Sequence, residues 1–332
     1  MSEARPQGTA RPVQRRAAGA KARAAAGRAA RLYVGYRTRQ TAWALIFLLP
    51  ALILFGLIVV YPFGWAAWIS LNDWGFFRSP AFIGPGNYAR LLDDPLFWKS
   101  LKITFTWTLG VVPAILLISL PLALILNAGW VKLKGLFRAI YFAPVVTNIV
   151  AAAFVWRWLF DPGVGVINWI LGSLGLGKPG WLADPAWALQ AVMVVGVWKQ
   201  IGQAMVLFLA GLQTIPAHYM EAARIDGAGR WQLFRHITLP LLNPTVLFVV
   251  VILAINAFRV FTIPYVMSTG GLQMRTPGGP LDSTRVFVLH IYDVGFKQFE
   301  LGYASANAFV LMALIIAVTL IQIRLIQRPF EY

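Results

Sequence analysis

Residues 43–63 read WALIFLLPALILFGLIVVYPF and carry no charged side chain. The charge-free stretch around them continues from Arg39 to Asp73. Because a helix rises about 1.5 Å per residue, about 20 apolar residues cross the roughly 30 Å of hydrocarbon in a bilayer. A secretory signal has a shorter apolar core and ends at a small-residue cleavage site, whereas this run continues into YPFGW at residues 61–65. The stretch therefore predicts a retained transmembrane helix.

Five further stretches have the length and apolar character of a membrane span. The third of the six is the weakest, since it carries Arg157 near one end, and the fourth contains Lys199. Trp residues near many of the span ends are typical of a membrane interface. The predicted spans are residues 43–63, 104–127, 141–160, 188–212, 245–264 and 304–324. We therefore predict an all-α fold, a polytopic membrane protein with six transmembrane helices within residues 41–328.

The composition excludes a soluble enzyme. Of the 332 residues, 59% are apolar or aromatic and only 12% are charged, whereas an average soluble domain has about 25% charged residues. The chain has no cysteine, so disulfides, thiolate metal sites and a cysteine nucleophile are also excluded. Its three histidines are scattered and predict no metal site.

One glycine-rich stretch imitates a phosphate-binding loop. Residues 172–178 read GSLGLGK and fit its first seven positions, but Pro179 stands where Ser or Thr would bind magnesium. No strand of a nucleotide-binding domain precedes the stretch, and no catalytic triad or dense carboxylate cluster is present. We expect no enzymatic activity and no cofactor in this chain. If ATP drives it, a partner chain binds the ATP.

The first forty residues differ in composition from the rest. They contain ten Lys or Arg and one acid, a net +9 of the chain's formal +17. A segment so charged and so poor in apolar residues is expected to be disordered in water. A nucleic-acid-binding arm and an organelle transit peptide are alternatives. Its position before a membrane span favours a basic cytoplasmic tail, residues 1–40, and no nucleic-acid partner.

The other basic residues predict the orientation of the spans. With the N-terminus inside, the inner segments hold eighteen Lys and Arg, and the outer loops hold eight. Cytoplasmic loops carry an excess of these residues, so both termini are predicted to be cytoplasmic. The short inner loop 129–138 supports this orientation independently of the tail.

The inner loop 213–243 is long and patterned. Pro216 can open a short helix, which is predicted to end near Asp226 because Gly227 and Gly229 follow. A second short helix is predicted with one apolar face, closed by two prolines. That face consists of Trp231, Phe234 and Ile237, and the prolines are Pro240 and Pro244. Two short helices joined at a glycine elbow make a projection that fits the groove of a partner protein.

This loop carries a family resemblance. Residues 221–228 read EAARIDGA, and they are followed by Phe234, Ile237, Leu239-Pro240 and Pro244. The pattern resembles the EAA loop of binding-protein-dependent ABC importers of the carbohydrate type. Further residues that match the pattern of this family are Phe82-Ile83-Gly84, Asn87-Tyr88, Pro144, Trp198 and Gly278-Gly279-Pro280. Together they resemble the first permease subunit of the maltose and glycerol-phosphate type over residues 41–328. The basic tail has no counterpart there, and the extra spans and large outer domain of the maltose prototype are missing.

The resemblance implies an ABC importer permease fold in which the first loop helix is the coupling helix, seated in a cleft of a cytoplasmic ATPase. Glu221 is then expected to face a basic residue of the ATPase, while Gly227 permits the turn. The alternative is that Glu221 merely pairs with Arg224 at i,i+3. The coupling residues implied are Glu221, Ala222, Ala223, Asp226, Gly227 and Ala228.

The same resemblance implies the partners and the location. They are a second homologous permease subunit, two ATP-binding subunits, an extracytoplasmic solute-binding protein and a sugar or related polyol. The chain is expected in the inner membrane of a bacterial or archaeal cell, surrounded by lipid bilayer.

Placing a polar side chain inside a membrane span costs free energy, so such residues are candidates for a function. Contacts between helices are an alternative role for each of them. They are Asn148, Lys199, Gln200, Gln203, Asn256, Arg259 and Asn307. The resemblance implies a sugar path lined by Val145, Asn148, Trp198, Lys199, Gln200, Asn256 and Val260. Trp198 is expected to stack on a sugar, and Gln200 and Asn256 to bind hydroxyls. Lys199 either offsets an anionic group or reaches the interface and pairs. Because most of these positions depart from the prototype, a different substrate is expected.

Two other functions fit parts of the sequence. A gradient-driven secondary transporter or channel with six spans explains the helices but not the patterned loop. A membrane-tethered nucleic-acid binder would use residues 1–40 and would bind in a salt-sensitive manner.

Overall fold

The computed structural model describes residues 40–41, 43–75, 79–269 and 277–326. The predicted tail, except for its last residue, lies outside these ranges. The chain divides into two units, Met1–Ala66 and Ala67–Tyr332, which are considered separately.

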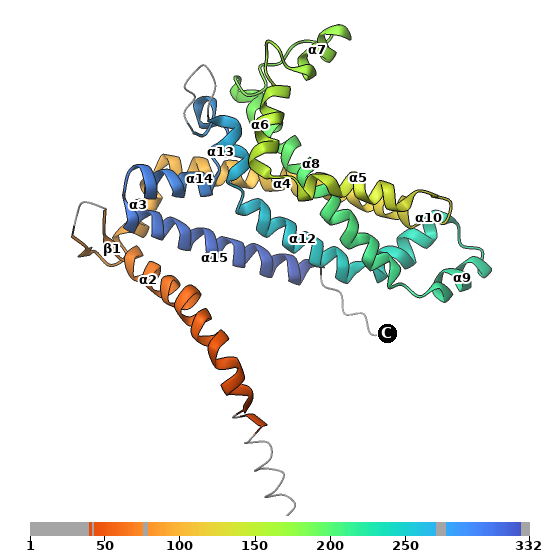
Figure 1. Ribbon diagram of the computed structural model, residues 1–332, viewed down its shortest axis with the longest axis horizontal. Coiled ribbons are helices and arrows are strands. Elements are labelled where there is room, and N and C mark those ends of the chain that lie inside the picture. Colours follow the sequence, from red (N-terminus) through yellow and green to blue (C-terminus); the bar gives the residue numbers. More distant parts are fainter. Residues whose placement is uncertain (1–39, 42, 76–78, 270–276, 327–332) are drawn as a thin grey trace, which may run out of the picture. The chain divides into compact units, whose positions relative to one another are not determined.

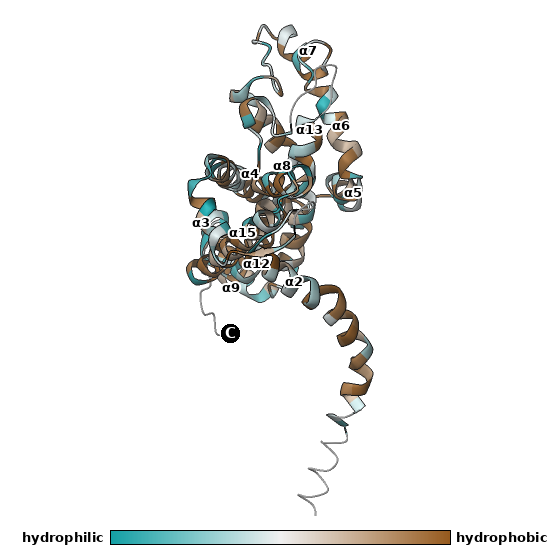
Figure 2. Ribbon diagram, turned by 90° about the vertical axis from the view of Figure 1, so that its left-hand side faces the viewer, coloured by the Kyte–Doolittle hydropathy of each residue, from teal (hydrophilic) through white to brown (hydrophobic). Residues whose placement is uncertain are grey.

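The first unit holds the whole of the first predicted span, which belongs to a helix that begins at Trp43 and ends at Ser70. Its middle forms a π-helical turn, η1 (Gly56–Val60), before α2 (Tyr61–Ser70). In this turn the Tyr61 N–H bonds to Gly56 O five residues back, next to Pro62, which has no N–H to donate. The helix is brown along most of its length in Figure 2, and its apolar side chains are exposed. A helix that is apolar all round suits hydrocarbon.

Four long helices form the frame of the second unit. They are α4 (Pro95–Asn127), α8 (Pro185–Gln213), α12 (Asn243–Phe258) and α15 (Leu301–Ile326). Figure 1 shows them side by side, with α4 packed on α8 and α12, and α12 packed on α15. At the α4–α8 contact Trp107 is fully buried, and a Cβ at Gly196 would lie 2.6 Å from its ring. Only glycine allows the two helices to approach this closely.

Two of these helices begin before their predicted starts, α4 by nine residues and α8 by three. Helix α4 begins at Pro95, where the Asp94 side chain accepts hydrogen bonds from the N–H groups of Leu96 and Phe97. Helix α8 begins at Pro185, and Asp184 caps it in the same way. An aspartate followed by proline is a strong helix start, so both helices extend beyond the apolar stretches from which they were predicted.

The third predicted span, 141–160, is not one continuous helix, and in this respect the prediction was wrong. The segment forms α5 (Lys134–Val146) and α6 (Ile149–Leu159), which meet at an angle of 97°. The Asn148 side chain accepts hydrogen bonds from the N–H groups of Val150 and Ala151 and so begins a new helix. Within the described residues, five helices are long and apolar enough to cross a membrane, and the bent pair would make a sixth.

The fifth predicted span, 245–264, is interrupted as well. Helix α12 ends at Phe258, and a separate helix, α13 (Thr262–Ser268), packs against α6. Figure 1 shows α6 and α13 together on one side of the long helices.

The loop 213–243 contains the first short helix as predicted, α9 (Ala217–Ile225). The second was predicted to be closed by Pro240 and Pro244, and its helical segment ends between them at Leu241, but it is longer and less regular than one short helix. Helix α10 (Arg230–Leu233) runs through the π-helix η2 (Phe234–Thr238) and α11 (Leu239–Leu241) almost directly into α12. Both prolines lie in the first turn of a helical segment, where their missing N–H is tolerated.

The remaining elements are short. The only strands among the described residues form one antiparallel pair, so the all-α prediction is confirmed in substance. Figure 1 shows α9 and α3 at opposite ends of the second unit. The short elements are β1 (Asn72–Asp73), β2 (Ala81–Phe82), α3 (Gly86–Asp93), α7 (Val166–Ser173), η3 (Pro280–Asp282), α14 (Phe287–Tyr292) and η4 (Asp293–Lys297).

Candidate functional site

A cavity of about 330 Å³ lies where both interrupted spans meet α8. The α5–α6 break contributes to one side, one face of α8 contributes the second, and the α12–α13 junction contributes the third. The lining residues are Val145, Ile149, Lys199, Gln200, Gln203, Asn256, Arg259, Val260, Phe261, Thr262 and Ile263. Helix breaks at membrane depth occur where backbone lines a cavity or is buried in protein, so the two breaks and the cavity belong together.

The cavity brings together five of the seven residues predicted for the substrate path: Val145, Lys199, Gln200, Asn256 and Val260. The other two are not among its lining. The side-chain oxygen of Asn148 caps the start of α6. Trp198 points its ring at Trp156, with the ring centroids 5.5 Å apart in a T-shaped arrangement.

Lys199 forms no ion pair with a carboxylate in the described structure. Its Nζ donates hydrogen bonds to the carbonyl oxygens of Pro144 and Thr147, both at 2.6 Å, and of Val145 at 3.2 Å. These carbonyls lie at the end of α5, where a helix has unpaired acceptors and a negative partial charge. The ammonium group therefore stabilises the end of α5 at the break.

The other polar lining residues suit a ligand with many hydroxyl groups. Gln200, Gln203 and Asn256 carry amides, each of which can donate and accept hydrogen bonds. Asn256 is exposed, and the two glutamines are half-buried. A few polar groups among apolar walls are typical of small-molecule sites.

The sequence prediction missed Phe261 and Thr262, because both lie in a segment predicted to be a continuous helix. Phe261 stacks on Tyr265 with ring centroids 5.1 Å apart and an interplanar angle of 20°. It thus supplies the cavity with the aromatic side chain that was expected from Trp198. Pro264, which sits in the first turns of α13, is the signal that could have indicated a new helix.

The cavity lies near the middle of the membrane spans. Lys199 and Gln200 are at the centre of the span Pro185–Gln213, and Asn256 is at the centre of the span Asn243–Ser268. At about 1.5 Å per residue, Gln200 and Asn256 are each about 20 Å along their helix from the loop that joins α8 to α12. Both helices attached to the loop therefore carry cavity residues.

The first half of that loop ends in a tight helix cap. The N–H of Gly227 donates to Arg224 O at 3.1 Å, and the N–H of Ala228 donates to Ala223 O at 2.9 Å. This pair of bonds is the Schellman motif, which requires a left-handed residue directly after the helix. Gly227 has φ +83°, a conformation that costs an L-residue free energy.

Helix α9 presents side chains that make few contacts with its own chain. Glu221 and Asp226 are exposed, and Ile225 is 86% exposed. Within α9, which the structure describes in full, no ion pair joins Glu221 to Arg224. The alternative role predicted for Glu221 is thus absent from the structure. Acidic and apolar groups exposed together on a short helix suit a basic, partly apolar groove.

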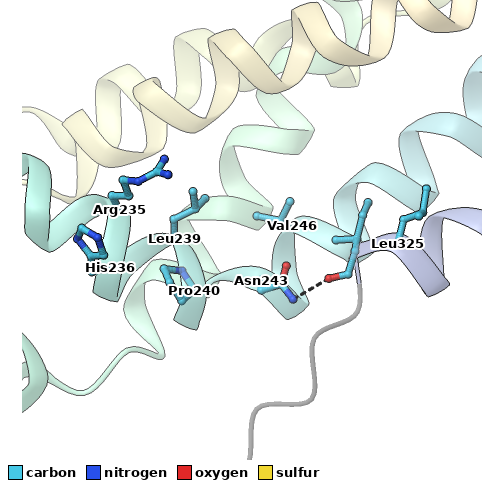
Figure 3. A pocket seen from close by; sticks show the side chains of 8 residues that line it. Arg235, His236, Leu239, Pro240, Asn243, Val246 and Leu325 are labelled. Atoms are coloured by element: carbon cyan, nitrogen blue, oxygen red, sulfur yellow. Dashed lines mark hydrogen bonds between the residues drawn. The ribbon is translucent and has the colours of Figure 1, made fainter.

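A second cavity, of about 590 Å³, lies where the loop joins α12. Figure 3 shows Arg235, His236, Leu239, Pro240, Val246 and Leu325 around it. Across this cavity the side-chain amide of Asn243 donates a hydrogen bond to Ile326 O at 3.0 Å. The bond connects the start of α12 to the end of α15.

The known proteins that this chain resembles in sequence and in fold are components of transport systems. The sequence profile of the family described as binding-protein-dependent transport system inner membrane component matches residues 119–330. The sulfoquinovosyl glycerol transport system permease protein SmoG of Agrobacterium fabrum is 36% identical over 286 residues, which cover 86% of this chain and 90% of that protein.

The trehalose/maltose transport system permease protein MalF of Thermococcus litoralis is 33% identical over 287 residues, covering 86% of this chain and 94% of that protein. A chain from the crystal structure of a bacterial ABC transporter involved in import of the acidic polysaccharide alginate has a TM-score of 0.75 and 23% identity. The match covers 89% of this chain and 99% of that chain, so the two share a fold.

Proposed function

Because this chain belongs to the family of binding-protein-dependent transport system inner membrane components, we propose that it forms part of the pathway through which a sugar or related polyol enters the cell. It is a multi-pass permease subunit of an ABC importer and not an enzyme, and ATP is used by separate subunits of such importers. Relatives named for trehalose, maltose and sulfoquinovosyl glycerol support the carbohydrate class.

The observation that carries the proposal is the connection between loop and cavity. Helix α8 runs from Lys199 and Gln200 into the loop, and the nearly continuous segment α10–η2–α11–α12 runs from the loop to Asn256. A rigid displacement of α9 is thus passed to two of the walls of the cavity. Packed helices move as units, which makes this connection suited to opening the cavity alternately to the two sides.

The complete assembly has further members. A second homologous permease subunit closes the exposed side of the cavity, two ATP-binding subunits receive α9, and an extracytoplasmic solute-binding protein delivers the solute. In this account Glu221 binds a basic side chain of the ATPase, the small residues Ala222, Ala223 and Ala228 permit a close approach, and Asp226 and Gly227 form the turn.

The position of the loop supports the proposed orientation, with both termini in the cytoplasm. It must face the ATP-binding subunits in the cytoplasm, and four spans separate it from the N-terminus when the bent pair α5–α6 counts as one. An even number of crossings puts the N-terminus on the loop's side, and the sixth span returns the C-terminus there. The excess of basic residues in the inner segments supports the same orientation.

The test is charge reversal in α9. We expect Glu221→Lys to retain membrane insertion but to weaken recovery of the ATP-binding subunits, or ATP-driven uptake, at least about tenfold, since a cation would face a cation. Asp93→Lys is the matched control, because Asp93 is exposed on α3 at the opposite end of the second unit. Equal recovery and uptake in wild type and Glu221→Lys would contradict the coupling role. Uptake that resists vanadate but collapses with the ion gradient would favour a secondary transporter.

A further inference from the structure

The charges that line the cavity are all of one sign. Lys199 and Arg259 are its two charged lining residues, and no carboxylate lines it within the described structure. Both basic residues lie within membrane-spanning segments: Lys199 is at the middle of α8, and Arg259 directly follows the end of α12 inside the span Asn243–Ser268. Burying an ionisable group at this depth of a membrane costs free energy, and such groups are normally paired with a group of opposite charge.

Two other arginines of the described chain form ion pairs with carboxylates. The Arg285 guanidinium binds Asp282 at 2.7 Å and also binds Asp293, and Arg90 binds Glu300 at 2.7 Å. By contrast, no described residue forms an ion pair with Arg259, whose side chain is exposed to the cavity. Arg259 therefore faces the cavity without a counter-charge from the described residues.

The hydrogen bonds of Lys199 do not remove its charge. Carbonyl dipoles at the end of α5 hold the ammonium group in place, and they offset its charge only in part because they are neutral groups. The cavity thus has one fixed cation, Lys199, and one cation with free donors, Arg259. A planar guanidinium with free donors suits the two-point binding of carboxylate, sulfonate or phosphate oxygens.

We propose that the solute taken by this cavity is an acidic saccharide, with its acid group bound to Arg259. This inference rests on the proposed function, since it specifies the substrate class of the same cavity. The neighbouring amides of Gln200, Gln203 and Asn256 bind the sugar hydroxyls, and the Phe261 ring lies against a sugar face. Lys199 adds to the positive potential in the cavity while its ammonium group stays hydrogen-bonded to the end of α5.

The experiment uses the complete complex in proteoliposomes, with its binding protein and ATP-binding subunits. Solute-stimulated ATP hydrolysis is measured with matched pairs of neutral and acidic oligosaccharides of equal length, built from glucose and glucuronate, galactose and galacturonate, or mannose and mannuronate. We expect stimulation by an acidic member and little by its neutral counterpart.

Variants then locate the effect. Arg259→Gln should raise the half-saturating concentration of the acidic solute tenfold or more, because a charge-assisted hydrogen bond is lost. Arg259→Lys should retain most of the response. Lys178→Gln is the control, since it removes one positive charge from an exposed loop outside the cavity.

The outcomes separate the two proposals. Stimulation by a neutral sugar that is unchanged in Arg259→Gln overturns the acidic-solute inference and leaves sugar import standing. Equal losses for neutral and acidic solutes in Arg259→Gln also overturn it, because a counter-charge from a partner subunit would then explain Arg259. A complex that couples ATP hydrolysis to some other solute and ignores every saccharide overturns the proposed function itself.

Discussion

Replacing Gly227 by alanine should weaken the coupling of this chain to its ATP-binding subunits by straining one turn. Gly227 follows α9 with φ +83°, and its N–H and that of Ala228 cap the helix. An L-residue in the left-handed region costs about 1–2 kcal/mol. A Cβ at this position meets no atom within 4 Å, so conformational strain is the whole effect and no clash adds to it.

That strain lowers the population of the docking-competent loop by roughly 5-fold to 30-fold. If the ATP-binding subunits recognise only this conformation, their apparent affinity falls by the same factor. The assay is a titration of ATP-binding subunits against the solubilised permease, together with uptake when those subunits are limiting.

The chain offers a matched control two residues away. Gly229 has φ −71° and ψ 166°, which any residue adopts, and a Cβ there would meet only the Gln232 side chain at an ordinary 3.6 Å. Gly229→Ala should therefore bind and transport like wild type. Equal defects in the two variants, or a Gly227→Ala variant with normal affinity, would refute the reasoning.

Three further predictions follow from the packing and charges. Gly202→Ala should lower the thermal stability of the permease by about 1–3 kcal/mol or more, because a Cβ there would lie 2.0 Å from Tyr141 O on α5. Lys199→Met should destabilise the protein by about 1–3 kcal/mol in thermal unfolding, since carbonyls at the end of α5 lose their partner. Burial lowers the pKa of His290, although the nearby Asp94 carboxylate opposes the shift. Because unfolding then takes up a proton, stability measured by thermal unfolding should fall as the pH drops below about 6.5, by at most about 1.4 kcal/mol per pH unit.

Each of these has a control. Gly110→Ala should be tolerated better than Gly202→Ala, because its Cβ would meet only the flexible end of Met193. Lys199→Arg should recover part of the stability lost in Lys199→Met, as it keeps charge and donors. His290→Gln should flatten the pH dependence just below neutrality. An unchanged slope in that variant would assign the dependence to another group.

The sequence predicted the helices well where charge and apolar length alone determine them. The run 43–63 contains no charge and could only be a membrane helix. The short loop helix was predicted from Pro216 and Gly227, and α9 lies between them as expected. In both cases a local feature, either a long apolar run or a capping residue, determines the structure without help from distant contacts.

The breaks in the spans could not be predicted in this way. Hydropathy counts apolar residues, and a break does not change their number. The α5–α6 break depends on Asn148 as a cap and on Lys199, which is more than fifty residues away in the sequence and binds the free carbonyls. Such a contact becomes visible only when α8 and α5 are packed together. Polar positions in the spans identified much of the cavity, whereas Phe261 was missed because nothing polar marks it.

The central claim is that α9 controls the cavity through α8 and α12. The chain has no cysteine, so Asn256→Cys places one thiol in the cavity wall. In proteoliposomes containing the whole complex, its rate of modification by a membrane-impermeant maleimide is measured with and without ATP and vanadate. The account predicts a several-fold difference between the two states, which disappears when Glu221→Lys is added. Equal rates in both states of an intact, transporting complex, or a nucleotide response that survives Glu221→Lys, would contradict it.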